Sequence, residues 1–368
     1  MVELRKEKGR PVLFTYALTS ERHDVHNLSY HQSIVADKKS SLIDLETIKE
    51  KSDAVLDIKE GNDQEKIKEY SEKIRKLHLA SRAMSKSAVV SLPVSSIFHA
   101  IVTLPIVKKK DELDRLLKAE VKKFISFSLE DLALDYQLLG IDQKEGVQRI
   151  LINAVPNVII KFYTEIFKKA GMVLEALEPE STALTRSLVG RDTAVSMIVD
   201  IGAERTNFFI IDQSIPITHQ SIETGGDKID KIIQNIIGLD KEIVEQAKVD
   251  LFGYLGSNRN DLPGIDQKKF LDIFIPMVDP IIKEIEISFE LYLRQTGNES
   301  KKPEKVILSG GSALLPFLAD YISDRFKLKC FVGDPWARVV YQDSLKPILS
   351  RIGPRMSVAI GLALRNMV

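Results

Sequence analysis

The stretch that decides the fold runs from Met197 to Asp227 and reads MIVDIGAERTNFFIIDQSIPITHQSIETGGD. It predicts two apolar strands joined by a tight polar turn, then a third strand that ends at Thr224-Gly225-Gly226-Asp227. The first turn, Asp200 to Asn207, can direct backbone N–H groups and a Thr hydroxyl at a phosphate, with Asp200 holding a metal or a water. Taken alone, the stretch is more simply an ordinary β-hairpin, so the rest of the chain must decide.

Composition places the chain among ordinary globular proteins. Its 368 residues are 44% hydrophobic and 28% charged, which is enough for two domains with a large core. Lys+Arg and Asp+Glu number 52 each, so nothing indicates nucleic acid as a partner. The single cysteine, Cys330, fits a reducing cytosol. With no signal peptide and no apolar run of about 18 residues, we expect a cytoplasmic protein that does not itself insert into a membrane.

Two further glycine turns follow in the C-terminal half. Gly225-Gly226 directly precedes a predicted helix to Ile237, and Ser309-Gly310-Gly311-Ser312 follows a buried strand and opens a helix predicted from Ala313 to Phe326. Free N–H groups and the helix dipole favour an anion at such helix starts. Between these turns, Glu245 and Lys248 are three residues apart on one predicted helix. Three glycine turns and this pair, in this order, are unlikely to be accidental.

Other familiar sites are absent from the sequence. It has no Walker A loop, no Gly-x-Ser-x-Gly elbow, no His-Glu-x-x-His and no Cys–His pairing. His23, His26 and His31 are spaced closely enough for a metal, but they fall in a polar segment with no regular element to fix them. A metal site there is therefore disfavoured.

On these motifs the chain resembles the actin-like ATPase superfamily. The second phosphate loop of that superfamily is similar to Asp200–Asn207, and its Gly-Gly turn to Thr224–Asp227. The helix that carries a ribose-contacting Glu and a base-contacting Lys matches Val244–Lys248, with Val in place of Ala. The adenosine motif is similar to Ile307–Pro316, and the final hinge segment to Ser357–Ala363.

Within the superfamily, the chain resembles the PilM family of type IV pilus assembly proteins. Five segments carry this likeness: Glu120–Phe127, Leu129–Asp131, Leu134–Leu138, Leu177–Leu184 and Val332–Pro335. One departure is Ser126, where the family commonly has Pro.

The resemblance implies an α/β, two-lobed actin-like ATPase fold with a small α+β subdomain inserted in the first lobe. Residues 1–85 and 156–190 would form the first lobe, 86–155 the inserted subdomain, and 191–368 the second lobe with the nucleotide motifs.

The resemblance also implies ATP or ADP with Mg as the cofactor. Asp200 and Thr206 would lie on the Mg-phosphate side, with Asp200 as the metal ligand, and Glu245 and Lys248 on the ribose and base side. The full implied set is Asp200, Gly202, Thr206, Asn207, Gly225, Gly226, Asp227, Glu245, Lys248, Gly310, Gly311 and Ser312.

One element of the superfamily is not found. Its first phosphate loop, of Asp-x-Gly-x-x-Ser/Thr-x-Lys type, should precede Val2, and Met1–Arg5 resemble the strand that follows that loop. Either the start of the sequence is wrong or shortened, or this chain has lost the loop. Each charge-assisted hydrogen bond lost with the loop is worth about 1.5–3 kcal/mol. We therefore expect at most a weak ATPase, with no catalytic residue assigned.

The function implied is a cytoplasmic scaffold of the type IV pilus assembly complex at the inner membrane. It would bind the N-terminal cytoplasmic peptide of a PilN-like bitopic membrane protein, and other pilus assembly proteins are possible partners. One alternative is a cell-division protein of FtsA type, although that family ends in an amphipathic membrane helix and this chain ends at Arg365-Asn366-Met367-Val368. Another is a small-molecule kinase of the same superfamily, which would need a catalytic Asp and sugar-recognition loops in the first lobe.

Overall fold

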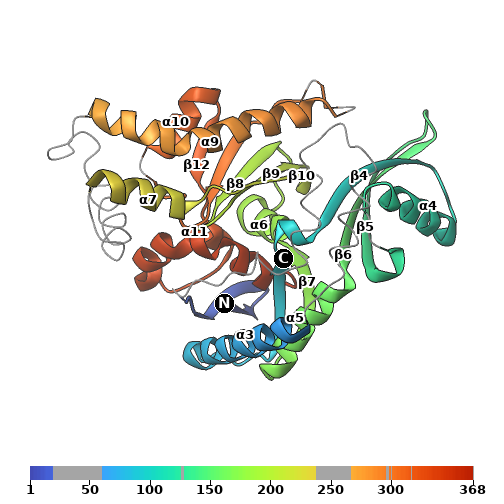
Figure 1. Ribbon diagram of the computed structural model, residues 1–368, viewed down its shortest axis with the longest axis horizontal. Coiled ribbons are helices and arrows are strands. Elements are labelled where there is room, and N and C mark those ends of the chain that lie inside the picture. The colour runs from blue at the N-terminus through green and yellow to red at the C-terminus, as the bar shows by residue number, and fades with distance from the viewer. Residues whose placement is uncertain are drawn as a thin grey trace. The chain divides into compact units, whose positions relative to one another are not determined.

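The computed structural model describes residues 1–19, 60–125, 128–237, 267–295, 298–299, 301–315 and 317–367. The chain divides into two compact units, unit 1 from Met1 to Glu180 and unit 2 from Ser181 to Asn366 (Figure 1). Among the described helices, none combines the length and apolar character needed to cross a lipid bilayer. No group of three or more His, Cys, Asp or Glu residues that could hold a metal occurs in the described ranges, and His23, His26 and His31 lie outside them.

Unit 1 begins with the predicted hairpin. Strands β1 (Val2–Glu7) and β2 (Arg10–Tyr16) pair antiparallel. Both residues of the two-residue turn have positive φ, 49° at Lys8 and 81° at Gly9. Positive φ at both loop residues is the conformation that best joins two right-twisted strands through a two-residue loop. Gly9 adopts this conformation without a Cβ penalty.

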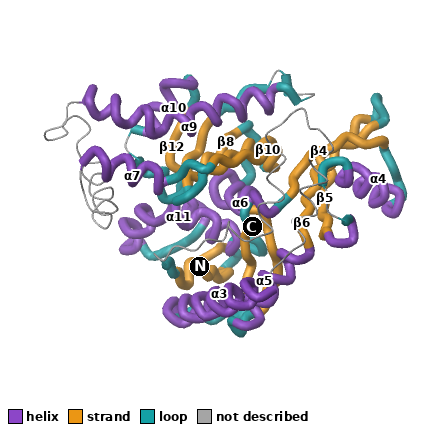
Figure 2. Tube along the Cα trace, in the orientation of Figure 1, coloured by secondary structure: helices purple, strands orange, loops and turns teal. Residues whose placement is uncertain are grey.

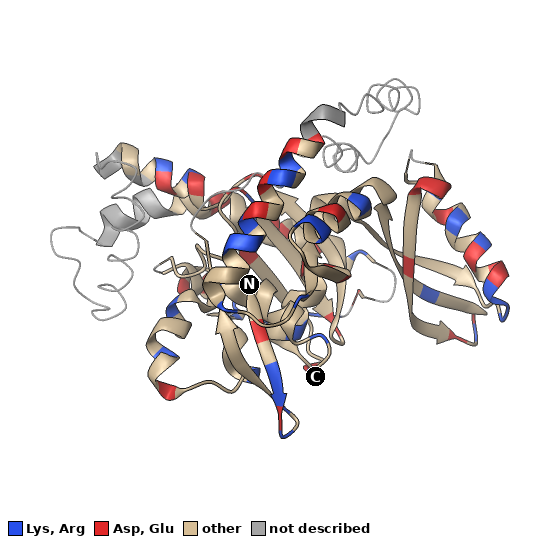
Figure 3. Cartoon of the chain, turned by 90° about the horizontal axis from the view of Figure 1, so that it is seen from below, with Lys and Arg blue, Asp and Glu red and all other residues tan. Residues whose placement is uncertain are grey.

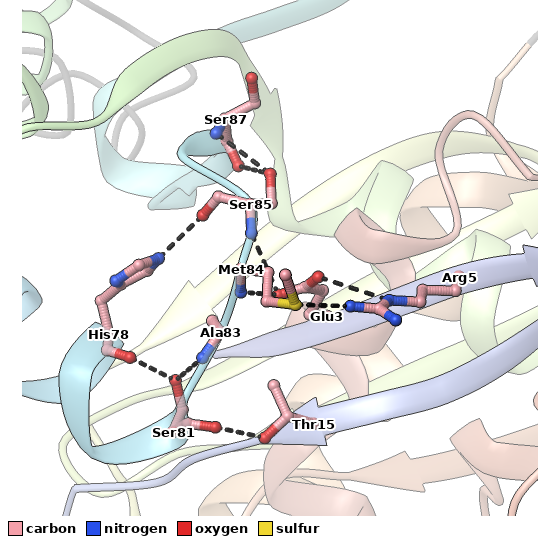
Figure 4. Close-up of polar contacts among 9 residues, drawn as sticks. All are labelled: Glu3, Arg5, Thr15, His78, Ser81, Ala83, Met84, Ser85 and Ser87. Atoms are coloured by element: carbon pink, nitrogen blue, oxygen red, sulfur yellow. Dashed lines mark hydrogen bonds and ion pairs between the residues drawn. The ribbon is translucent and has the colours of Figure 1, made fainter.

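Hydrogen bonds attach this hairpin to the segment that follows helix α3 (Glu60–Ser81), as Figure 4 shows. The Glu3 carboxylate accepts from the backbone amides of Met84 at 2.7 Å and Ser85 at 3.3 Å. The Thr15 hydroxyl donates to the Ser81 carbonyl at 2.6 Å. The hairpin is thus held to the end of α3 by side chains from both of its strands.

The first core of unit 1 lies between α3 and α5 (Asn157–Lys169) and the parallel strands β3 (Ser87–Leu92) and β7 (Val173–Pro179). Apolar residues of α5 recur at helical spacing and face this core. Its buried members are Ile67, Leu92, Ile97, Ile159, Phe162, Tyr163, Ile166 and Phe167.

A second core belongs to the strands β4 (Phe98–Pro105), β5 (Leu132–Asp142) and β6 (Val147–Pro156), which pair antiparallel in the order β4-β6-β5. Helix α4 (Lys110–Lys122) covers them. The core consists of Val102, Leu104, Leu117, Val121, Leu132, Ile150, Ile152 and Ala154. The outer face of α4 carries both signs of charge (Figure 3). Lys108, Lys109 and Lys110 are all exposed, so they form a solvated start to the helix.

The division of the chain into two lobes and an inserted subdomain stays a prediction.

Unit 2 is built on a five-stranded mixed sheet. Its order is β10-β9-β8-β11-β12, with β8 parallel to β11 and antiparallel to β9. The strands are β8 (Ser196–Ile201), β9 (Thr206–Asp212), β10 (Ile215–Ile222), β11 (Lys305–Ser309) and β12 (Lys329–Val332). Consecutive residues Met197, Ile198 and Val199 are all fully buried, which requires cover on both faces of the sheet.

Helices supply that cover. Helices α9 (Gln267–Leu293) and α10 (Leu318–Phe326) lie on one face, and α6 (Glu180–Leu184) and α11 (Lys346–Ala363) lie on the other (Figures 1 and 2). Helix α7 (Gly226–Ile237) begins at the second glycine of the Gly-Gly turn, one residue before the predicted start at Asp227.

The predicted helix start at Ala313 is wrong. Residues 311–314 form a turn, and α10 begins only at Leu318 after Phe317, whose φ is 61°. A proline at position 316 of the sequence disfavours helical backbone in the residue before it, which opposes continuous helix through this segment.

Candidate functional site

The site is built at one edge of the unit 2 sheet, where β8 ends and β9 begins. Asp200 lies beside Asn207 of β9 and beside Ser309 of β11 in the sheet register. The turn between β8 and β9 is closed by a hydrogen bond of 2.9 Å from the Gly202 amide to the Arg205 carbonyl.

The Gly-Gly turn packs directly on this first turn. The amides of Gly226 and Asp227 donate to the carbonyls of Gly202 and Ala203, at 2.9 and 2.8 Å. A Cβ added at Gly225 would lie 2.5 Å from the Ala203 carbonyl oxygen, so only glycine fits there. The two turns therefore contact each other backbone to backbone.

The third turn joins them from β11. Gly310 has a φ of 87°, and a Cβ there would lie 2.3 Å from the carbonyl oxygen of Ile201. The Ser312 amide donates to the same carbonyl at 3.3 Å. The three glycine turns, far apart in the sequence, thus meet at one place.

These contacts change the expected role of the backbone amides. The amides of Gly226 and Asp227 are not free at the start of α7, because the first turn accepts both. The Ser309–Ser312 turn, moreover, is not a helix N-terminus. In the described part of the chain, the amides of Ala203, Gly225 and Gly311 are among the turn amides that donate no hydrogen bond. An anion at this edge would be held by fewer amides than the sequence motifs imply.

Several predicted side chains point into the protein. Thr206 is fully buried, and its hydroxyl donates to the Thr224 carbonyl at 2.6 Å, which fixes the end of β10. Asn207 and Ser312 are also buried. The Thr206 hydroxyl and the Ser312 amide therefore help to hold the turns in place. Glu245 and Lys248 lie outside the described residues, so their part in the site stays a prediction.

Asp200 is the titratable group at the centre of the site. Desolvation by burial raises the pKa of its carboxyl to about 6, although a hydrogen bond from the Ser309 side chain opposes the shift. As a whole residue Asp200 is partly exposed, so the carboxyl group is enclosed without being sealed off. Mg²⁺ prefers hard oxygen ligands such as carboxylates, and the enclosed Asp200 carboxyl fits that preference.

The raised pKa of Asp200 predicts a pH dependence of stability. The folded state binds the proton more tightly than the unfolded state, whose pKa is near 3.8, so the stabilisation is complete below about pH 4 and is lost as the pH rises through about 6. We expect Asp200→Asn to exceed the wild type in unfolding free energy by about 1–3 kcal/mol at pH 7.5, and by much less at pH 4.

Urea unfolding, followed by the fluorescence of Trp336, measures this difference. Trp336 is the only tryptophan in the sequence and is buried in unit 2, so it reports on the unit that contains Asp200. An equal difference between the two proteins at both pH values would contradict the assignment.

Helix α11 contributes two residues that the motifs did not identify. The Pro354 carbonyl accepts from the Gly310 amide at 2.9 Å and from the Ser309 hydroxyl at 3.3 Å. The side chain of Arg355 lies against Gly311, with its Cγ 3.6 Å from where a Cβ of Gly311 would be. The sequence feature that could have indicated these two residues is Gly353-Pro354, just before the small-residue segment Ser357–Ala363.

The chain is similar to several known proteins, and one family model matches most of its length. The family model "Type IV pilus assembly protein PilM" matches residues 36–367. A solved "PilM-PilN type IV pilus biogenesis complex" matches with a TM-score of 0.73 and 20% identity, over 100% of this chain and 95% of that one. MreB5 of Spiroplasma citri bound to ADP matches with a TM-score of 0.43 and 12% identity, over 80% of this chain and 73% of that one.

Among curated proteins, the chaperone protein DnaK of Methanothermobacter thermautotrophicus is 25% identical over 313 residues, or 72% of this chain. The chain spans about half of that relative, 48% of its length. The fold is the α/β actin-like ATPase fold expected from the sequence. Because the family model covers most of the chain, the protein belongs to the type IV pilus assembly protein PilM family.

Proposed function

We propose that this protein is a nucleotide-binding scaffold of the type IV pilus assembly complex at the inner membrane. In this role it binds the N-terminal cytoplasmic peptide of a PilN-like bitopic membrane protein. Membership of the PilM family supports the pilus assignment. The fold match to a chain of a PilM–PilN complex supports a partner of PilN type.

The observation that carries nucleotide binding is the meeting of the three glycine turns. Gly225 and Gly310 tolerate no Cβ because each packs against backbone of the first turn or the strand before it. Such glycine turns beside an enclosed carboxylate suit a phosphate-bearing ligand with Mg²⁺. ATP or ADP with Mg is the proposed ligand. Asp200 would hold the metal, and the unengaged amides of Ala203, Gly225 and Gly311 would face the phosphates. When bound, Mg²⁺ would neutralise phosphate charge.

Two titrations test this function on the full chain. Isothermal titration calorimetry with MgATP and MgADP should show binding, and phosphate release should be slow or absent. A fluorescent peptide that copies the N-terminal cytoplasmic segment of the organism's PilN-like protein should bind the chain, whereas a scrambled peptide of the same composition should not. Absence of peptide binding together with sugar-dependent ATP turnover would favour a small-molecule kinase and overturn the proposal.

A further inference from the structure

Helix α11 places a cation beside the third glycine turn. Two hydrogen bonds to the Pro354 carbonyl, from Gly310 and Ser309, hold this point of the helix against the turn. Arg355 is the next residue, and its Cγ, Cδ and Nε lie 3.6–3.8 Å from where a Cβ of Gly311 would be. The aliphatic part of the side chain therefore rests on the turn, while Arg355 as a residue is exposed.

Arg355 differs from the other cations near the three turns. Arg205 is paired with Glu223 at 2.9 Å, and Lys228 donates to the Thr224 hydroxyl at 3.2 Å. Arg355 makes no ion pair and no hydrogen bond with its side chain in the part of the chain that the structure describes. Its guanidinium keeps all five donors available.

A phosphate at this site would need a positively charged partner such as the Arg355 guanidinium. The amides of Gly202, Gly226, Asp227, Gly310 and Ser312 are already engaged within the protein, so they are not available to an anion. A nucleotide brings negative charge to this edge. A planar guanidinium can bind two phosphate oxygens at once, and charge-assisted hydrogen bonds of this kind are about twice as strong as neutral ones.

We propose that Arg355 binds a phosphate group of the nucleotide, and so selects phosphorylated ligands over the nucleoside. This inference rests on the proposed nucleotide-binding function. Arg355 would act as a binding residue at the third turn, with its position set by Pro354 and Gly311.

The test compares Arg355→Gln with Arg294→Gln. Arg294 is an exposed arginine of the same unit that follows α9 and donates to Glu290. Arg294 is close in sequence to Tyr292, whose hydroxyl contacts Asp212, the last residue of β9. The glycine turns lie at the other end of β9, near Thr206, which pairs with Ile201. The two variants therefore lose the same charge, but Arg294 is at the end of the strand away from the turns. Each protein is titrated with MgADP and with adenosine, and fluorescence unfolding verifies that each is folded.

We expect Arg355→Gln to bind MgADP about 10- to 100-fold more weakly than the wild type, the range of one charge-assisted hydrogen-bonded contact. Adenosine affinity should be unchanged, Arg294→Gln should match the wild type, and Arg355→Lys should recover only part of the loss. Wild-type affinity for MgADP in Arg355→Gln would overturn the inference and leave the proposed function intact. Equal losses for MgADP and adenosine would assign Arg355 to the base and overturn the phosphate role. A wild type that binds neither ligand would overturn the proposed function as well.

Discussion

Gly310→Ala is expected to destabilise unit 2 by about 3–5 kcal/mol, because two separate penalties add. The φ of 87° is unfavourable for any residue with a Cβ, and the added Cβ would lie 2.3 Å from the Ile201 carbonyl oxygen. Ile201 cannot move away cheaply, since it is fully buried and pairs with Thr206 in the sheet. Urea unfolding followed by Trp336 fluorescence measures the loss. Any folded fraction should also bind MgADP poorly.

The neighbouring glycine provides the matched control. A Cβ at Gly311 meets nothing closer than 3.6 Å, and that contact is with a flexible arginine side chain. Gly311→Ala should therefore change the unfolding free energy by no more than about 0.5 kcal/mol, as surface substitutions usually do. Similar losses for the two variants would show that the Ile201 contact does not determine the conformation of the turn.

Gly361→Ala in α11 is expected to destabilise unit 2 by about 3 kcal/mol, against the sign that helix propensity predicts. Alanine in a helix interior is favoured over glycine by about 1 kcal/mol. Here, however, the new Cβ would lie 1.9 Å from the Ala183 carbonyl oxygen of α6, and Ala183 is fully buried. The Gly361 carbonyl also accepts from Arg186 at 2.6 Å, so separating the helices would lengthen that hydrogen bond.

The sign of the change in unfolding free energy shows whether the Cβ clash or helix propensity dominates at Gly361. Denaturant unfolding of Gly361→Ala, read from Trp336, should shift to a lower midpoint. An upward shift would mean that propensity dominates and that the two helices can move apart at little cost. Gly361→Ser should lose at least as much as alanine, since it adds the same Cβ and a hydroxyl.

The sequence predicted those parts of the site that depend on local backbone chemistry. Gly225 and Gly310 were identified from the sequence as members of glycine turns, and the structure shows at both positions a backbone approach that leaves no room for a Cβ. What the motifs could not show is which groups the turn amides bind. The engagement of the Gly226 and Asp227 amides depends on the meeting of two turns, which no local pattern reveals.

Prolines account for the helix bounds that sequence reasoning set too short. The apolar spacing of the sequence predicts a long helix from Met277 to Tyr292, and its small residues predict a closely packed helix from Arg355 to Asn366. In the structure α9 begins at Gln267 and α11 begins at Lys346. Pro276 and Pro280 lie on the exposed side of α9, where water can satisfy the carbonyl groups that lose their donors. In α11, Pro354 is buried and its own carbonyl accepts from the third turn. The local rule that a proline ends a helix therefore fails in both helices, with solvent exposure of the prolines in α9 and a tertiary contact of Pro354 in α11.

The two cores of unit 1 have a consequence for the order of folding. Strands β3 and β7 pair in parallel, and the whole of the β4-β6-β5 sheet lies between them in the sequence. Their pairing therefore closes a long loop. Phe98 at the start of β4 is registered with Ala154 near the end of β6, so the chain enters and leaves that sheet at adjacent positions. If the three-stranded sheet forms first, the remaining loop is much shorter, which lowers its closure entropy by on the order of 1 kcal/mol. The second core would then act as an early folding unit that brings β3 and β7 together.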